Sequence, residues 1–195
     1  MLQASPLSLN VDSAKRLHEE SVLRGHQGCV NRLAWNDSGS LLASGSDDTK
    51  VLIWSYPHNQ VQPPLCVNTE HTGEEEMAQH SKRSRFSDTV APKPTSSAAG
   101  NLFGVRFLPE SGDRVIVTGA MDRTVQLHTI DTVGSHKRVP NRPFRHARGA
   151  GLEEAPTVEV VPSSTTVYEC HRQRVKHVEV APGDANLFFS ASEDG

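Results

Sequence analysis

The sequence predicts an all-β protein built from repeated antiparallel units, and three observations support this fold class. Apolar and polar residues alternate in short runs, which is typical of half-buried strands. Three hairpin-like segments repeat one pattern, and each follows another strand-like run that ends in a turn. The segments are LLASGSDDTKVLIW (41–54), VIVTGAMDRTVQLH (115–128) and LFFSASEDG (187–195). Such self-similarity indicates a repeat architecture.

The three segments share the spacing between a hydroxyl residue and an Asp. A Ser or Thr lies four residues before an Asp in each, and in the first two a ring-bearing residue follows the Asp after six more. The Asp falls in a predicted hairpin turn. The runs before the hairpins are VNRLAWNDSG (30–39), LFGVRFLPESGD (102–113) and VKHVEVAPGD (175–184), and LCVN (65–68) is a candidate fourth strand. We therefore expect four antiparallel strands per unit.

Composition excludes several classes of protein. The net charge of −3 over 195 residues provides no global field that attracts nucleic acid, so we expect no nucleic-acid partner. No apolar run reaches the roughly 18 residues needed to span a bilayer, so we expect no membrane association. The first ten residues, MLQASPLSLN, lack the features of a secretory signal. We expect an intracellular protein, cytoplasmic, nuclear or both.

The three cysteines predict neither a metal site nor a disulfide framework. Cys29, Cys66 and Cys170 are odd in number and far apart, and no pair has zinc-ligand spacing. None of the ten His is paired on one element with a carboxylate or thiol that would complete a metal site. We therefore expect no metal, no cofactor and no small-molecule ligand.

The repeated signature resembles the WD-repeat blade, the building block of the β-propeller. That resemblance implies a buried hydrogen-bonded network of a loop His, a strand Ser or Thr, the turn Asp and a strand Trp. It assigns His26, Ser44, Asp48 and Trp54 to the first unit, His71, Thr118, Asp122 and His128 to the second, and His171, Ser190 and Asp194 to the third. The alternative for His71 and His171 is that they are ordinary loop histidines.

His, Ser and Asp are also the residue types of a nucleophilic catalytic triad. Their recurrence three times in one chain, in hairpin turns and not on a nucleophile elbow, favours a structural role. A buried carboxylate needs donors, and an imidazole, a hydroxyl and an indole can supply them in series. We therefore predict no catalytic residue and no enzymatic activity.

The resemblance predicts about two and a half blades of a propeller with long disordered insertions. The turn Asp residues are 74 and 72 positions apart, whereas such a repeat occupies roughly 40–45. The expected units are an N-terminal extension (1–21), repeat 1 (22–68), repeat 2 (69–130) with a disordered insertion (73–99), a basic linker or insertion (131–165) and a truncated repeat 3 (166–195). SVLRGH (21–26) is a candidate closing strand.

The two insertions leave alternatives open. The first contains KRSR (82–85), and the second contains the basic stretch SHKRVPNRPFRHARGAG (135–151). Either could be a nuclear-import signal or a contact for a phosphate backbone, and either could be a solvated linker. The chain stops inside the third hairpin turn, and a propeller ring needs roughly four to eight blades, so we expect a piece of a longer protein.

A narrower resemblance is carried by VLRGHQGCVNRLAWNDSGSLLASGSDD (from 22), NLFGVRFLPESGDRVIVTGAMD (101–122) and VYECHRQRVKHVEVAPGDANLFFSASEDG (167–195). These segments look like the start of the WD and tetratricopeptide repeats family. That family implies a substrate receptor of a cullin-RING ubiquitin ligase, bound through the damaged-DNA-binding adaptor. The chain departs from the Trp-Asp-x-Arg ending of many adaptor-binding blades, because Trp54 precedes Ser55 and His128 precedes Thr129.

Two classes of function follow. The first is the ligase substrate receptor, which presents proteins for ubiquitination through its propeller face and supplies proximity instead of bond chemistry. The second is a scaffold or peptide reader unrelated to ubiquitin, for example in a chromatin or RNA assembly, with the basic insertion in electrostatic contact. Both are protein-interaction roles.

Overall fold

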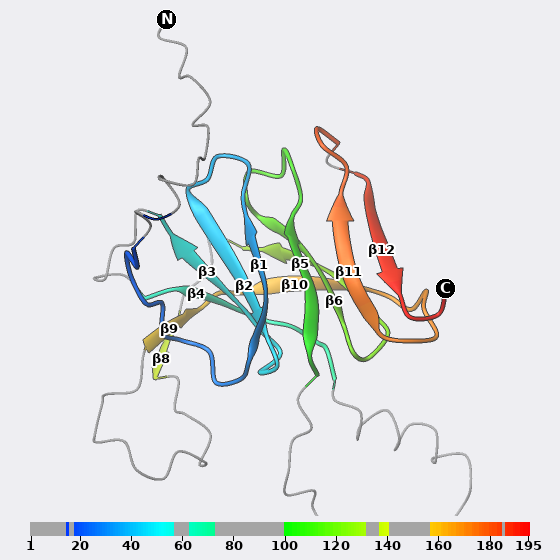
Figure 1. Cartoon of the computed structure of the whole chain (residues 1–195), viewed down its shortest axis with the longest axis horizontal. Helices are drawn as coiled ribbons and strands as arrows, with labels where there is room; N and C mark the ends of the chain where they lie inside the picture. Colours follow the sequence, from blue (N-terminus) through cyan, green and yellow to red (C-terminus); the bar gives the residue numbers. More distant parts are fainter. Residues whose placement is uncertain are drawn as a thin grey trace, which may run out of the picture.

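The computed structural model describes residue 15 and residues 18–56, 63–72, 100–131, 137–140, 157–184 and 186–195. Every regular element in these ranges is a β-strand, which confirms the all-β fold class (Figure 1). The described residues contain no helix that is long and apolar enough to cross a bilayer.

The first sheet has six strands in the order β1-β2-β3-β4-β9-β8. The first four pair antiparallel with their sequence neighbours, as in a meander, and β9 then pairs parallel with β4. The strands are β1 (Val30–Trp35), β2 (Leu41–Ser46), β3 (Lys50–Ser55), β4 (Leu65–Asn68), β9 (Thr157–Val160) and β8 (Lys137–Pro140). The first sheet is thus one blade with two strands added at its outer edge.

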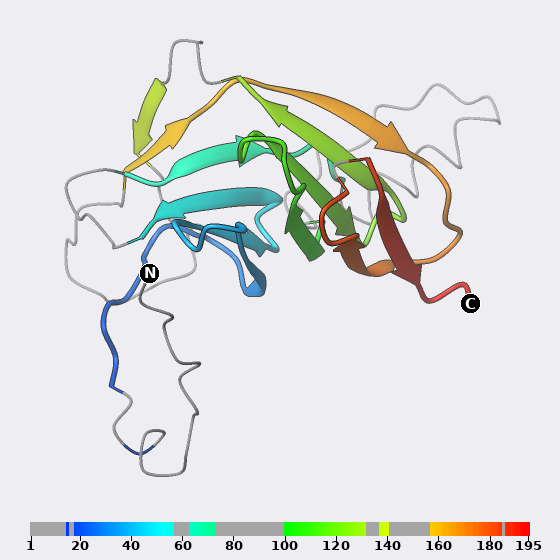
Figure 2. The ribbon, with the colours of Figure 1, turned by 90° about the horizontal axis from the view of Figure 1, so that it is seen from above.

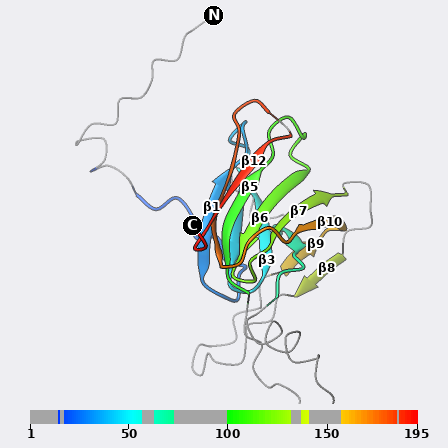
Figure 3. The same cartoon turned by 90° about the vertical axis from the view of Figure 1, so that its right-hand side faces the viewer.

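The second sheet has four antiparallel strands in the order β5-β6-β7-β10, and the third has two. The second contains β5 (Leu102–Phe107), β6 (Val115–Ala120), β7 (Val125–Ile130) and β10 (Ser163–Tyr168), and the third contains β11 (Val175–Val180) and β12 (Phe188–Ser192). The sheets stand side by side in chain order, like neighbouring blades (Figure 1), and in Figure 3 they are seen one behind another from the side of the third sheet. This arrangement is part of a β-propeller.

The three sheets repeat one register. A bulge interrupts the pairing of the first two strands at the same place in each unit. The hydroxyl residue of the second strand pairs with an apolar residue of the first, and these pairs are Leu33 with Ser44, Val105 with Thr118, and Val178 with Ser190. Equivalent positions can therefore be compared between blades.

Glycines on the second strands let neighbouring blades pack closely. A Cβ atom built on Gly45 would lie 2.5 Å from Cγ2 of Val105 in the next blade, and one on Gly119 would lie 2.7 Å from Cγ1 of Val175. Val105 is fully buried in the apolar cluster shared by the first two sheets. Its register equivalent in the first blade, Leu33, is 57% exposed, because no sheet of the described structure packs on that face.

Residues 131–165, assigned as a basic linker or insertion, contain strands β8 and β9 and the start of β10. Because β10 is the outer strand of the second sheet, residues 163–168 belong to that blade, and the assignment of residues 166–168 to repeat 3 is wrong. The partners of β9 and β10 in β4 and β7 are distant in sequence, so no local pattern identifies these strands. The insertion 73–99 and most of the basic stretch 135–151 lie outside the described residues.

The N-terminal segment also differs from expectation. Residues 21–26, the candidate closing strand SVLRGH, form no strand in this structure, and the described sheets include no last blade with which they could pair. Leu23 instead packs against the apolar cluster that contains Leu52 and Trp54.

Substitution of Gly45 by Ala should destabilise the contact between the first two blades. The added methyl group has no room beside Val105, and overpacking costs about 1–3 kcal/mol, which exceeds the backbone-entropy gain of about 0.4–1 kcal/mol expected from Gly→Ala. Urea denaturation should report a lower free energy of unfolding, whereas Ser55→Ala, at an exposed position of the same sheet, should not differ from wild type. An unchanged or higher stability of Gly45→Ala would refute the close approach.

Candidate functional site

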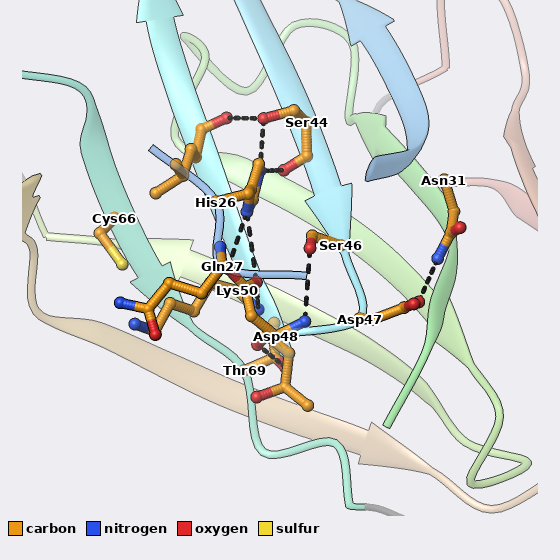
Figure 4. A network of polar contacts seen from close by, with 12 residues as sticks. His26, Gln27, Asn31, Ser44, Ser46, Asp47, Asp48, Lys50, Cys66 and Thr69 are labelled. Carbon is orange, nitrogen blue, oxygen red and sulfur yellow. Dashed lines mark hydrogen bonds and ion pairs between the residues drawn. The ribbon is translucent and has the colours of Figure 1, made fainter. Parts of the chain in front are cut away.

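The first polar network joins a loop, a turn and two strands of the first blade (Figure 4). His26 lies in the loop before β1, Ser44 in β2, Asp48 in the β2–β3 turn and Trp54 in β3. His26 Nδ1 lies 3.1 and 3.2 Å from the two Asp48 carboxylate oxygens, and His26 Nε2 lies 2.7 Å from Ser44 Oγ. Trp54 Nε1–H donates to Ser44 Oγ at 2.9 Å. The structure therefore brings these four residues together.

The hydrogen bonds of this network run in one direction. A carboxylate only accepts, so His26 carries its proton on Nδ1 toward Asp48. In the neutral ring His26 Nε2 is then the acceptor for the Ser44 hydroxyl, and the Ser44 oxygen accepts from the indole. In this arrangement the donors of Trp54, Ser44 and His26 each have an acceptor.

The Asp48 carboxylate is held in its charged form despite burial. Burial alone would raise its pKa, because desolvation disfavours the charge. The hydrogen bond from His26, together with the backbone N–H groups of Gln27 at 2.9 Å and Lys50 at 3.1 Å, outweighs burial and lowers the pKa of Asp48 below its ordinary value. The turn is consequently tied to the loop before β1 as well as to β3.

The second network repeats this geometry across the insertion 73–99. His71 Nδ1 lies 3.0 Å from both Asp122 carboxylate oxygens, and His71 Nε2 lies 2.8 Å from Thr118 Oγ1. His128 Nε2 lies 3.0 Å from the same hydroxyl. All four residues are buried, and burial alone would raise the pKa of Asp122. The hydrogen bond and charge of His71, with the backbone N–H groups of Thr124 and Thr72, outweigh burial and lower that pKa. His71 is therefore part of a network and not a free loop residue.

His128 in the second blade has two ring nitrogens that find partners, whereas the equivalent Trp54 in the first blade has a single indole nitrogen. Its Nε2–H donates to Thr118 as the indole does to Ser44, and its second nitrogen, Nδ1, lies 3.3 Å from Thr165 Oγ1 in β10. Burial lowers the pKa of His128 to about 4, and the nearby His71 adds to this effect. A neutral His128 can accept from the Thr165 hydroxyl, so the second network extends to the outermost strand of its blade.

The third network is smaller and more exposed. His171 Nδ1 lies 3.2 Å from an Asp194 carboxylate oxygen, and His171 Nε2 lies 2.8 Å from Ser190 Oγ. The backbone N–H of Arg172 donates to Asp194 at 2.6 Å and is the main cause of the lowered pKa of that carboxyl. The side chains of His171 and Asp194 are 17% and 21% exposed. Every residue that the sequence analysis assigned to a network thus contacts its assigned partners.

The sequence analysis missed several members of the second network. Thr124 Oγ1 donates to Asp122 at 2.9 Å, and Gln126, which is 1% exposed, accepts from the Glu70 N–H at 3.0 Å. Thr165 was also missed. Thr124 follows the turn Asp by two residues, which is a usable local signal, whereas Thr165 depends on the pairing of β10 with β7.

The connectivity of Ser44, His26 and Asp48 matches that of a catalytic triad, but its environment differs. Ser44 is 2% exposed and its oxygen already accepts from Trp54, so neither space nor an approach path for a substrate exists at this hydroxyl. The network instead holds the loop and turn of the blade against its strands. The role of this network is therefore structural.

The described residues offer no cluster of three or more His, Cys, Asp or Glu side chains that could hold a metal ion. Cys66 is buried within the first blade, where burial raises the pKa of its thiol to about 11, so it packs as an apolar residue. Cys29 and Cys170 are exposed and lie outside the strands.

The fold, its repeated networks and the sequence matches define the class of protein. The family described as "WD domain, G-beta repeat" matches residues 18–55, which include the whole first network. Residues 18–55 are therefore a WD repeat, the described sheets form part of a β-propeller, and these findings support the role of a protein-interaction scaffold.

Comparison with individual proteins shows which WD-repeat proteins this chain is similar to. The chain is 35% identical to Protein ALTERED SEED GERMINATION 2 of Arabidopsis thaliana and 32% identical to WD and tetratricopeptide repeats protein 1 of Homo sapiens, in each case over 93% of this chain and 18% of the relative. It is 25% identical to DDB1- and CUL4-associated factor 6 of Homo sapiens, over 93% of this chain and 15% of that protein. The similarity to the WD and tetratricopeptide repeats family is confirmed. The chain spans less than a fifth of the length of these relatives.

A comparison with solved structures also gives a match. A humanized mutant of the Chaetomium thermophilum Polycomb Repressive Complex 2, bound to the inhibitor GSK126, overlaps with a TM-score of 0.48 at 24% identity, covering 89% of this chain and 28% of that one.

Asp48→Asn should destabilise the first blade by about 2 kcal/mol, because hydrogen bonds to a buried carboxylate contribute about 1.5–3 kcal/mol and an amide nitrogen would face donors. Urea denaturation measures this loss. Asp37→Asn, at an exposed turn position of the same blade, is the matched control and should leave the free energy of unfolding unchanged. Equal stabilities of the two variants would contradict the assigned role of Asp48.

The stability of the protein should rise with pH between about 4 and 6.5 through His128. Its pKa is about 4 in the fold and 6.5 ordinarily, so in this window the unfolded chain binds a proton that the folded chain does not. The contribution is complete above pH 6.5 and is lost as the pH falls toward 4, by on the order of 3 kcal/mol in total.

Urea denaturation at a series of pH values tests this titration. His128→Gln should flatten the rise in the free energy of unfolding between pH 4 and 6.5, because a glutamine does not titrate. His177→Gln, at a part-exposed position of β11, is the control and should retain the wild-type slope. An unaltered slope in His128→Gln would show that His128 is not held neutral by the fold.

Proposed function

We propose that this chain is part of a substrate receptor of a cullin-RING ubiquitin ligase. The observation that carries the proposal is the similarity, over 93% of the chain, to DDB1- and CUL4-associated factor 6, whose name states an association with the adaptor and the cullin. The similarity to WD and tetratricopeptide repeats protein 1 covers the same share of the chain. The name of DDB1- and CUL4-associated factor 6 supports a role in protein ubiquitination, and the second relative supports the WD-repeat fold.

The geometry is compatible with a role based on proximity. A receptor holds its substrate near a ligase and performs no bond chemistry itself, so it needs a rigid frame and an accessible surface. The networks of His26 and His71 supply rigidity by tying turns and loops to strands. Asn31 and Cys29, beside those loops, are exposed and available to a partner.

The proposal includes partners and location. Its partners are proteins, namely the damaged-DNA-binding adaptor, a cullin and a substrate, and its location is the cytoplasm, the nucleus or both. The departure from Trp-Asp-x-Arg at Trp54-Ser55 and His128-Thr129 means that the adaptor would contact these blades through other residues or would contact the rest of a longer polypeptide.

Affinity purification of the full polypeptide containing this chain, at low salt, tests the proposal. We expect the adaptor and the cullin to be enriched over a tag-only control, and depletion of the adaptor to abolish recovery of the cullin. A folded protein that recovers neither would refute the receptor role and leave the scaffold unrelated to ubiquitin. Asp37→Asn, an exposed substitution, serves as a folded control and should recover both.

A further inference from the structure

Residues 157–168 run continuously along the outer edges of two blades, and we name this segment the inter-blade strap. Its first part, β9, pairs parallel with β4 of the first blade, and its second part, β10, pairs antiparallel with β7 of the second. Only Val161 and Pro162 lie between the two strands. Figure 2 shows the strap, yellow to orange, crossing from one sheet to the next.

The attachment of the strap to the first blade combines backbone bonds and burial. The N–H of Glu159 donates to the Pro64 carbonyl at 2.9 Å, and the N–H of Val161 donates to the Cys66 carbonyl at 3.1 Å. Val158 is 2% exposed and belongs to the apolar cluster that contains Cys66 and Trp54. The strap therefore reaches the cluster around the aromatic member of the first network.

The attachment to the second blade reaches the equivalent residue. All six residues of β10 pair with β7, and the N–H of Asp131 donates to the Pro162 carbonyl at 2.9 Å. Thr165 Oγ1 lies 3.3 Å from His128 Nδ1, and His128 occupies the position that Trp54 occupies in the first blade. One short segment thus contacts His128 in the second blade and joins the apolar cluster that contains the equivalent Trp54 in the first.

The connection between these attachments is itself buried. Val161 is 3% exposed and lies in the apolar cluster that the first two sheets share, together with Val67 and Ile116. A segment anchored in both blades and in the cluster between them cannot leave one blade without disturbing the other. Among the described residues, no equivalent segment pairs with both the second and the third sheets.

We propose that the inter-blade strap couples the first two blades into one cooperative unit, so that detachment of β9 from β4 loosens the second blade as well. Repeat proteins without such a segment are coupled only through the packed faces of neighbouring units. The strap adds a second coupling at the outer rim. This inference is independent of the proposed ligase role, since it concerns how two blades open.

Cys66 provides a reporter of the opening. It is fully buried and pairs with Val160 of the strap, whereas Cys29 and Cys170 are exposed. The thiolate of an accessible cysteine attacks iodoacetamide, forming a C–S bond and releasing iodide. Because Cys66 is fully buried, it should react when the fold around it opens, as when β9 leaves β4. The two exposed cysteines serve as internal standards within the same molecule.

The test compares matched substitutions at the two ends of the strap. Val158→Ala removes buried contact in the first blade, and Val167→Ala, at a 41% exposed strap position, is its control. Thr165→Val removes the hydroxyl that faces His128, and Thr166→Val, at the adjacent exposed position, is its control. Native-state alkylation of Cys66 by iodoacetamide is measured by mass spectrometry, with hydrogen exchange measured in β4 and β7.

Coupling predicts effects that cross between the blades. Val158→Ala should accelerate alkylation of Cys66 roughly tenfold and also accelerate hydrogen exchange in β7 of the second blade. Thr165→Val, a change in the second blade, should accelerate alkylation of Cys66 in the first roughly fivefold. The two controls should match wild type.

Effects confined to one blade would overturn the proposal. If Val158→Ala exposes Cys66 while exchange in β7 is unchanged, the strap is a local flap on the first blade. If Val158→Ala does not fold, Thr165→Val decides alone, and an unchanged alkylation rate of Cys66 in that variant overturns the coupling.

Discussion

The buried carboxylate in the hairpin turn of each of the first two blades is the constraint on which those blades depend. Asp48 and Asp122 are removed from water, which disfavours their charge, and each remains ionised because a histidine ring and backbone N–H groups donate to it. Those donors come from the loop before the blade and from the turn itself. Satisfying one charge therefore closes the loop onto the turn, and loss of any donor would leave a buried charge with too few partners.

The same three residue types that perform nucleophilic catalysis elsewhere here act as structural links, and burial accounts for the difference. Ser44 Oγ lies 2.7 Å from His26 Nε2, yet the hydroxyl is enclosed and its oxygen also accepts from Trp54. The hydrogen-bonding capacity of the Ser44 hydroxyl is therefore used within the fold. What remains for function is the accessible surface of a rigid frame, which suits a protein-interaction scaffold and the receptor role proposed for it.

Alternation, the turn Asp and its spacing to a Ser or Thr located the strands of the three hairpins, because these patterns are local. The resemblance to a WD-repeat blade assigned the residues of each network, including the histidines that lie far from their Asp partners in sequence. Sequence reasoning missed the strap. The residues Ser163–Tyr168 are mostly Ser and Thr, and they become a strand only because β7 offers an edge some forty residues earlier in the chain. The contact between Thr165 and His128 follows from that pairing, so no spacing rule within the second hairpin could reveal it.

The sequence by itself determined the all-β class, the repeated hairpin and the residue types of the polar networks, because alternation and turn chemistry act over a few neighbouring residues. The tertiary structure alone decided which distant segments meet. It placed β9 on the first blade and β10 on the second, buried Val161 between them, and left Leu33 exposed where its equivalent Val105 is covered. Sheet-edge pairing and blade packing are selected by the whole fold, since backbone N–H and C=O groups are alike at every edge and only the surrounding packing distinguishes them.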